Sequence, residues 1–349
     1  MSPKIVLACL FGACLAQVAA AAPSYTYRAL GGKFASVSEL NERGEVLVQS
    51  RASDSPSRAS IVGPSGYVDL GTLGGLNTEA YGINNRGDAV GISTIPNGEW
   101  RGFVFSGGQM REFMPGREVG PPNVINDRGD LAGGYGRPFF YRDGKIERFA
   151  TTDSPVNDIN ESGVVVGALN IPGQAQRPYM YSQGKLTDLG TLGGQTGVAT
   201  AINDRGAVVG YASTASEQGK AFLYQDGVMR DLGIPGANSA ASDINNLGQV
   251  VGMADGRPIL YSEGVLTDVN DLLPPGRNFE LVDASDINDR QEILAAACFT
   301  GNDAPSGCFG AVLTPVPAIP EPSSWLMLLA GAILLGYKAK SPQSAGLLS

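Results

Sequence analysis

Short apolar stretches alternate with polar turns along most of the chain. The segment 198–232 shows this most clearly, with strand-like runs at 198–202, 207–212, 221–224 and 228–232. Short runs of this kind, bounded by Asn, Asp and Gly, are typical of β-strands joined by tight turns. The segment therefore predicts a four-stranded meander.

The same pattern recurs seven times. Equivalent asparagines, separated by 43, 42, 34, 43, 42 and 43 residues, are Asn41, Asn84, Asn126, Asn160, Asn203, Asn245 and Asn288. Four strands in such a unit make one β-propeller blade, and a blade cannot bury its faces alone. The chain is therefore predicted to be all-β, a seven-bladed β-propeller of four-stranded antiparallel blades.

The two ends of the repeat region predict how the ring closes. The seventh unit supplies only three strands, at about 282–287, 292–297 and 310–314. Residues 25–32 end in Leu-Gly-Gly, as do 73–75 and 192–194, which follow fourth strands. We therefore expect the N-terminal strand to complete the last blade and remove an exposed sheet edge.

The repeated Asn predicts a structural turn. Its side chain can accept from backbone amides two residues on, and the Gly three residues later can adopt positive φ. Only the seventh unit lacks this Gly and has Gln291, which should strain the turn or change its type. A calcium loop is the alternative at 158–163 and 243–248. Arg, Ser or Leu stands where calcium loops place an oxygen ligand, so we expect no metal.

Composition argues against several classes of function. The formal net charge of −9 argues against nucleic-acid binding. The absence of histidine removes the commonest general base and the commonest nitrogen ligand of zinc. We expect no cofactor and no catalytic residues.

Residues 1–22 have a charged start, an apolar middle and a small-residue end, which predicts a secretory signal peptide. Cys9 and Cys14 fall inside it; a lipoprotein acylated at Cys14 is the alternative. Cys298 and Cys308 remain, and in an oxidising compartment they are predicted to form a disulfide rather than stay free thiols.

The C-terminal region 316–349 combines Pro320-Glu321-Pro322, an apolar run at 325–337 and the basic Lys338 and Lys340. This order resembles the PEP-CTERM sorting signal of Gram-negative bacteria. The resemblance implies a hydrophobic helix that anchors the protein transiently in the inner membrane. It also implies processing by an exosortase-type protease, with the cell surface or extracellular matrix as destination. A plain tail anchor is the alternative.

Residues 23–315 form the predicted propeller. The motifs "LGTLGG" at 70–75 and 189–194, "INxxGxxVG" and "AFLYxDG" resemble the HAF repeats of bacterial extracellular proteins. The His-Ala-Phe stretch of that family is changed here, with a cation in place of the His. No catalytic residue is carried over by this resemblance.

These cations define a candidate ligand-binding rim before the third strands: Arg58, Arg101, Arg137, Arg177, Lys220 and Arg257. They could bind carboxylates or sulfates of an anionic exopolysaccharide. Alternatively, each pairs with an acidic neighbour such as Asp158, Asp243 or Asp286.

The resulting prediction is a non-enzymatic, surface- or biofilm-matrix-associated module that binds exopolysaccharide or other surface glycans, or has a structural role. The alternative is a propeller glycoside hydrolase or lyase with paired carboxylates at the central opening. Loop carboxylates available for that chemistry are Asp143, Glu217, Asp226, Glu263 and Asp271.

Overall fold

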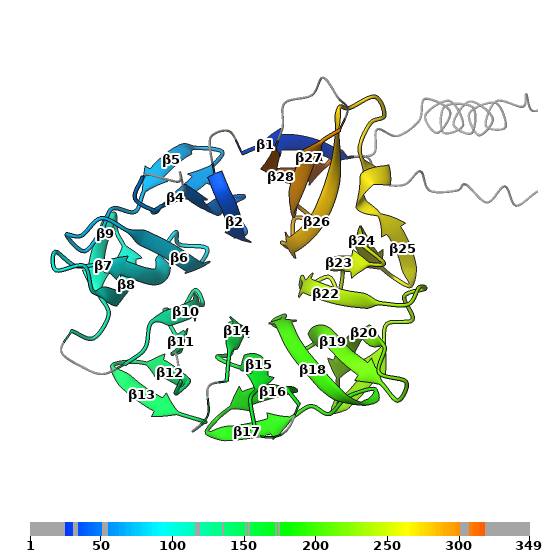
Figure 1. The fold of residues 1–349 in the computed structure, drawn as a ribbon, viewed down its shortest axis with the longest axis horizontal. Coiled ribbons are helices and arrows are strands. Elements are labelled where there is room, and N and C mark those ends of the chain that lie inside the picture. Colours follow the sequence, from blue (N-terminus) through cyan, green and yellow to red (C-terminus); the bar gives the residue numbers. More distant parts are fainter. Residues whose placement is uncertain are drawn as a thin grey trace, which may run out of the picture. The chain divides into compact units, whose positions relative to one another are not determined.

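A computed structural model describes residues 25–317, apart from 31–33, 51–54, 116–118, 135, 151, 153, 172, 174 and 301–306. These residues form seven four-stranded antiparallel sheets around a common axis (Figure 1), which confirms the predicted propeller. The predicted signal peptide, Pro320-Glu321-Pro322 and the C-terminal helix lie outside the described residues. Within the described range, no helix is long and apolar enough to cross a membrane.

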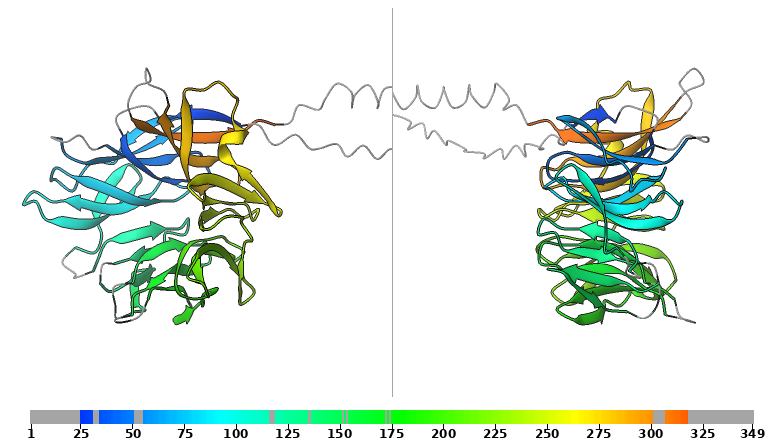
Figure 2. Two further views of the ribbon diagram at one scale, coloured as in Figure 1. Left: turned by 45° about the vertical axis from the view of Figure 1, so that its right-hand side comes forward. Right: turned by 90° about the vertical axis from the view of Figure 1, so that its left-hand side faces the viewer.

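Each blade runs from an inner first strand at the axis to an outer fourth strand, and the turned views show the blades as a flattened disc (Figure 2). The first strands are β2 (Phe34–Leu40), β6 (Thr78–Ile83), β10 (Pro122–Ile125), β14 (Val156–Ile159), β18 (Gly193–Ile202), β22 (Ser239–Ile244) and β26 (Phe279–Ile287). The second strands are β3 (Val46–Ser50), β7 (Ala89–Thr94), β11 (Leu131–Gly133), β15 (Val165–Leu169), β19 (Val208–Thr214), β23 (Val250–Ala254) and β27 (Ile293–Phe299).

The third strands are β4 (Arg58–Gly63), β8 (Trp100–Ser106), β12 (Phe139–Arg142), β16 (Arg177–Ser182), β20 (Gly219–Gln225), β24 (Arg257–Ser262) and β28 (Cys308–Pro315). The fourth strands are β5 (Gly66–Asp69), β9 (Gln109–Glu112), β13 (Lys145–Arg148), β17 (Lys185–Asp188), β21 (Val228–Asp231), β25 (Val265–Asp268) and, in the last blade, β1 (Tyr25–Ala29). A short 3₁₀ helix, η1 (Val269–Leu272), follows β25.

The core lies between neighbouring blades. All five residues of β15 are buried, whereas all four residues of β5 are exposed. Leu47 and Ile61 of one blade pack in the same cluster as Phe103 of the next. Burial therefore falls from the second strand outward, because the blades press against each other face to face while their outer strands meet solvent.

The N-terminal strand closes the ring as predicted. β1 pairs antiparallel with β28, from Tyr25 opposite Pro315 to Ala29 opposite Ala311. The Tyr25 side chain is 1% exposed, so the strand contributes to the core as well as to the sheet. In the same blade, a disulfide joins Cys298 of β27 to Cys308 of β28.

The repeated Asn turn has the predicted geometry. In the fifth blade, the N–H of Gly206 donates to the Asn203 carbonyl at 3.0 Å, and Gly206 has φ +79°. The seventh turn keeps this geometry with Gln291 at φ +63°. A side-chain-bearing residue is therefore held in the left-handed region, which costs strain without changing the turn.

Candidate binding site on the propeller axis

The repeated asparagines do more than shape turns, because they join the blades in a closed ring around the axis. In each blade the Asn Nδ2 donates to the backbone carbonyl of the corresponding Asn in the next blade, at 3.0–3.1 Å. Asn288 completes the circle by donating to the Asn41 carbonyl. We call Asn41, Asn84, Asn126, Asn160, Asn203, Asn245 and Asn288 the asparagine ring.

The residue after each Asn forms a second closed ring. Its side-chain oxygen accepts from the equivalent backbone N–H in the preceding blade, at 2.6–2.9 Å. This turn ring consists of Glu42, Asn85, Asp127, Glu161, Asp204, Asn246 and Asp289. Both rings use side-chain groups to satisfy turn amides or carbonyls of a neighbouring blade, so the repeated stretch is an inter-blade connector.

A β-bulge precedes these rings in every blade. In β6, Ala80 pairs with Gly91 and Gly82 with Val90, which leaves Tyr81 as the extra residue. The bulge also explains the Gly of the "VG" motif, because a Cβ on Gly91 would lie 2.1 Å from the Glu79 carbonyl oxygen. A bulge re-aims side chains, so two consecutive positions of the first strand can face the axis.

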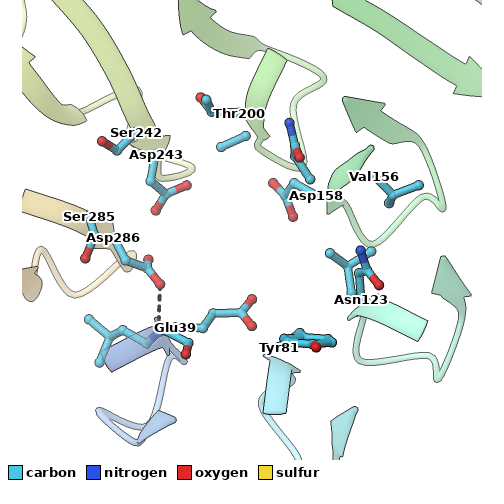
Figure 3. Close-up of a pocket in the computed structure, with 15 residues that line it drawn as sticks. Glu39, Tyr81, Asn123, Val156, Asp158, Thr200, Ser242, Asp243, Ser285 and Asp286 are labelled. Atoms are coloured by element: carbon cyan, nitrogen blue, oxygen red, sulfur yellow. Dashed lines mark hydrogen bonds between the residues drawn. The ribbon is translucent and has the colours of Figure 1, made fainter. Parts of the chain in front are cut away.

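Those two positions line an axial cavity of about 370 Å³. The bulged position contributes a polar side chain in every blade, and we call these residues the bulge ring: Ser38, Tyr81, Asn123, Asn157, Thr200, Ser242 and Ser285. The next position contributes the axial carboxyl groups: Glu39, Asp158, Asp243 and Asp286. Figure 3 shows Glu39, Asp158 and Asp243 extending from different sides toward the centre of this cavity.

Each axial carboxyl group accepts a backbone N–H from another blade's first strand. The N–H of Ile83 donates to Glu39 Oε2 at 2.8 Å, and the N–H of Ile202 donates to Asp158 Oδ2 at 2.7 Å. In the same way Ile287 donates to Asp243, and Leu40 donates to Asp286 (Figure 3). The carboxyl groups are thus held in fixed positions while part of each remains exposed to the cavity.

Burial controls the protonation of this set. It raises the pKa of Asp158 to about 7 and the pKa of Glu39 well above its usual range. It also raises the pKa of Asp286, where the charge of Asp243 acts in the same direction. Asp286 and Asp243 share a side-chain hydrogen bond, which raises the pKa of Asp286 further and opposes the rise at Asp243.

The predicted rim lies away from this cavity. The rim cations stand at or just before the third strands, so the antiparallel order places them on the opposite face from the asparagine turns, in the outer half of each blade. Four of them pair with a carboxylate at the end of the adjacent fourth strand: Arg58 with Asp69, Arg101 with Glu112, Arg177 with Asp188 and Arg257 with Asp268. Arg101 also pairs with Glu99, and Lys220 donates to the Gly236 carbonyl.

Arg137 is exposed and, among the described residues, has no carboxylate within ion-pair distance. The alternative that the rim cations pair with Asp158, Asp243 or Asp286 is wrong, because bulges direct all three acids into the axial cavity. Ligand binding by the rim stays a prediction.

The loop carboxylates considered for glycoside hydrolysis do not reach the axis. Asp143, Glu217, Asp226 and Glu263 are exposed at positive φ in turns, and Asp271 is exposed in η1. The carboxyl groups that do meet were missed, although a signal existed: each stands two residues before the repeated Asn. In the part of the chain that the structure describes, no three acidic or cysteine side chains are arranged to hold a metal ion.

Comparisons with known proteins identify one family match and several structures of similar fold. Residues 190–265 match a family described as a protein of unknown function (DUF3466). None of the curated proteins matches the chain.

Among solved structures, the chain is similar to the β-propeller domain of the Trilobed protease from Pyrococcus furiosus. That similarity has 12% identity and a TM-score of 0.53, and covers 83% of this chain and 100% of that one. The chain is also similar to the Pyrococcus horikoshii acylaminoacyl peptidase, with 13% identity, a TM-score of 0.52, and coverage of 78% of this chain and 52% of that one. The chain thus spans about half the length of the peptidase. At these identities the similarity shows the propeller fold alone.

Proposed function

We propose that this protein is an exported, non-enzymatic binding module of the bacterial cell surface or extracellular matrix, and that it binds glycan in its axial cavity. The signal-like N-terminus, the PEP-CTERM-like tail and the HAF-like repeats support the location. Residues 316–349 would anchor the protein in the membrane at first, and an exosortase-type protease would then process this tail.

The bulge ring is the observation that carries the proposed binding site. All seven blades place a residue with a hydroxyl or amide side chain at the same position, and these residues line one cavity; Asn157 and Thr200 also donate to backbone carbonyls of the next blade. Hydroxyl, amide and carboxyl groups around a pocket can exchange hydrogen bonds with the hydroxyls of a sugar, and Tyr81 adds an aromatic surface. The volume of about 370 Å³ lies within the range of small-ligand pockets.

The axial cavity fits this role better than the rim. Four rim cations already have carboxylate partners in their own blades. The residues lining the axial cavity include four acids and no Lys or Arg. An anionic exopolysaccharide therefore suits the rim, whereas the axial cavity suits neutral or positively charged glycan.

A binding assay with cell-surface polysaccharide separates these sites. The full chain would be compared with Ser242→Phe, which fills the cavity, and with an Arg58, Arg177, Arg257 triple change to Ala. We expect the unchanged protein and the triple variant to retain polysaccharide, and Ser242→Phe to lose at least about 10-fold in affinity, which is the effect of losing about 1.4 kcal/mol of binding.

Circular dichroism would check that Ser242→Phe is folded. Loss of binding in the triple variant alone would move the site to the rim. Absence of binding in every protein would refute the glycan-binding proposal.

A carboxylate-based glycoside hydrolase or lyase is the second candidate, and one observation favours it. Asp286, whose pKa is raised well above its usual range, lies beside Asp243 in the same cavity, so the two carboxyl groups could act as general acid and general base. New reducing or unsaturated sugar ends formed by the unchanged protein, and abolished by Asp243→Asn, would establish this candidate over the binding module.

A further inference from the structure

The charged side chains that line the axial cavity are all acidic. Asp243, Asp286 and Glu39 come from three consecutive blades and form an acidic wall, and Asp158 extends from a different side (Figure 3). The described residues that line the cavity include no lysine or arginine. Buried carboxylates without a cationic partner are costly, which favours an occupant that supplies the missing positive charge.

Blade connection alone does not require these acids. The equivalent positions in the other three blades hold Gly82, Val124 and Ala201, and the asparagine and turn rings continue through those blades unbroken. Four positions therefore keep a carboxyl group where a small or apolar residue suffices for the fold. Each of the four acids also accepts a first-strand N–H of the next blade, but the carboxyl charge is a feature that the other three blades do without.

The surrounding groups favour a donor-rich ligand. A carboxylate accepts hydrogen bonds, and an ammonium group has three donors and no acceptor. Asn123 also lines the cavity, and its buried Oδ1 has no hydrogen-bond partner among the described residues. No three acids converge in the manner of a metal site in the described residues. A polyatomic ammonium therefore fits the cavity better than a bare divalent ion.

We propose that the axial cavity selects ligands that combine a primary ammonium group with several hydroxyls, the class that includes amino sugars. The ammonium binds between Asp158 and the acidic wall of Asp243, Asp286 and Glu39. The ligand hydroxyls bind to the bulge ring. This inference rests on the proposed function, because it names the ligand class of the same cavity.

Binding should be coupled to proton release. The titratable groups facing Asp158 are Glu39 from β2, Tyr81 from β6, Asp204 after β18, Asp243 from β22 and Asp286 from β26. None is cationic, so burial without a positive partner favours the protonated form of Asp158 until a cation binds beside it. With an Asp158 pKa of about 7, its ionised fraction rises about 30-fold between pH 5.5 and pH 8, and affinity for ammonium should rise in proportion.

The test uses two matched probes, glucamine (1-amino-1-deoxysorbitol) and sorbitol, which differ only by an amine in place of a hydroxyl. Calorimetric titration of the full chain would be run at pH 5.5 and pH 8, in two buffers of different ionisation enthalpy. We expect glucamine to bind at least about 10-fold more tightly than sorbitol at pH 8. We also expect proton release with glucamine alone, and affinity for sorbitol that is independent of pH.

Asp158→Asn is the informative variant, because it removes the charge while its amide oxygen can still accept from the Ile202 N–H; it gives up only the second acceptor, which Oδ1 provides for the Ile159 N–H. It should lower glucamine affinity about 10-fold or more at pH 8 and flatten the pH dependence, with sorbitol binding unchanged. Asp226→Asn, which changes an exposed turn residue to the same extent, should leave both probes unaffected.

Two results would overturn the inference. The first is equal affinity for glucamine and sorbitol at pH 8, in a protein that still binds polysaccharide and loses this binding in Ser242→Phe. That result would refute amine selection and leave the proposed function standing. Glucamine binding that persists in both Asp158→Asn and Ser242→Phe would place the amine outside the axial cavity.

Discussion

At the residue scale, one asparagine per blade makes the turn and also connects the blades. Asn203 Oδ1 accepts from the N–H groups of Arg205 and Ala207, and its Nδ2 donates to the Asn245 carbonyl. An aspartate could accept the first two bonds but could not donate the third, because a carboxylate has no N–H. The need for an acceptor and a donor in one short side chain explains why this position is Asn in all seven blades.

Replacing Asn203 with Ala should lower the free energy of unfolding by about 2–4 kcal/mol, because three buried or half-buried backbone groups lose their partner. Thermal and denaturant unfolding would measure the loss. The control is Asn97→Ala, which removes a single exposed side-chain bond to the Glu99 N–H and should cost less than about 1 kcal/mol. Similar losses in both variants would contradict a special role for the asparagine ring.

At the element scale, the first strands determine the site and the N-terminal strand determines ring closure. A regular strand would direct alternate residues to opposite faces, whereas the bulge directs Ser242 and Asp243 to the same cavity. β1 supplies the strand that would otherwise be missing from the last blade. Without it, β28 would be a long unpaired edge.

Deleting residues 24–32 should therefore lower the melting temperature and promote association through β28. Scanning calorimetry and size-exclusion chromatography would detect the two effects. A synthetic peptide with the sequence of residues 24–32, added in excess, should restore the monomer and part of the lost stability, whereas a scrambled peptide should not. A deletion variant that melts and elutes like the full chain would disprove closure by this strand.

At the scale of the whole molecule, the ring brings four acids from distant parts of the sequence into one buried set. Glu39 and Asp286 stand 247 positions apart in the sequence, yet they lie in consecutive blades of the closed ring. Raised pKa values follow from this assembly, since the unfolded chain leaves each carboxyl group in water. The same set is expected to make stability depend on pH.

The sign follows from proton binding. Between about pH 4, where an unfolded aspartate titrates, and pH 7, the pKa of Asp158 in the fold, the folded protein binds more protons than the unfolded chain. Stability contributed by this group is therefore complete below the unfolded pKa and declines as pH rises toward 7. For each proton that the folded protein binds in excess of the unfolded chain, the free energy of unfolding falls by about 1.4 kcal/mol per pH unit.

We accordingly expect the melting temperature to fall from pH 5 to pH 8, and Asp158→Asn to reduce the fall. Melting curves in buffers of equal ionic strength would measure both. Burial alone would raise the pKa of Asp130, but its hydrogen bonds with Arg142 and Asn126 lower it. Asp130 therefore makes the protein less stable as pH falls, and it does so at a pH below this window. A melting temperature that rises steadily from pH 5 to pH 8 would contradict the inferred protonation of the axial carboxyl groups.

Much of the architecture could be predicted from sequence, because its causes are local and repeated. The Asn and Gly of each turn, the spacing of the units and the missing fourth strand are all visible along the chain. The seventh turn was predicted to be strained, and Gln291 does adopt positive φ. These features depend on backbone conformations within a few residues of each other, and the sequence contains that information directly.

The candidate site depended on tertiary structure. Asp158, Asp243 and Asp286 were visible as residues before Ile-Asn, but a regular alternating strand does not indicate that a bulge turns them toward the axis. The rim cations stand at or just before the third strands, as their order in the chain predicts. Four of the six pair with a fourth-strand carboxylate eleven positions onward, as Arg58 does with Asp69, and these partners were not predicted from the sequence. The sequence by itself determined the repeating blade and its closure, because these follow from local turn chemistry and strand number. Only the closed ring decided which acids meet, because burial and shared protons arise when seven separate strands converge on one axis.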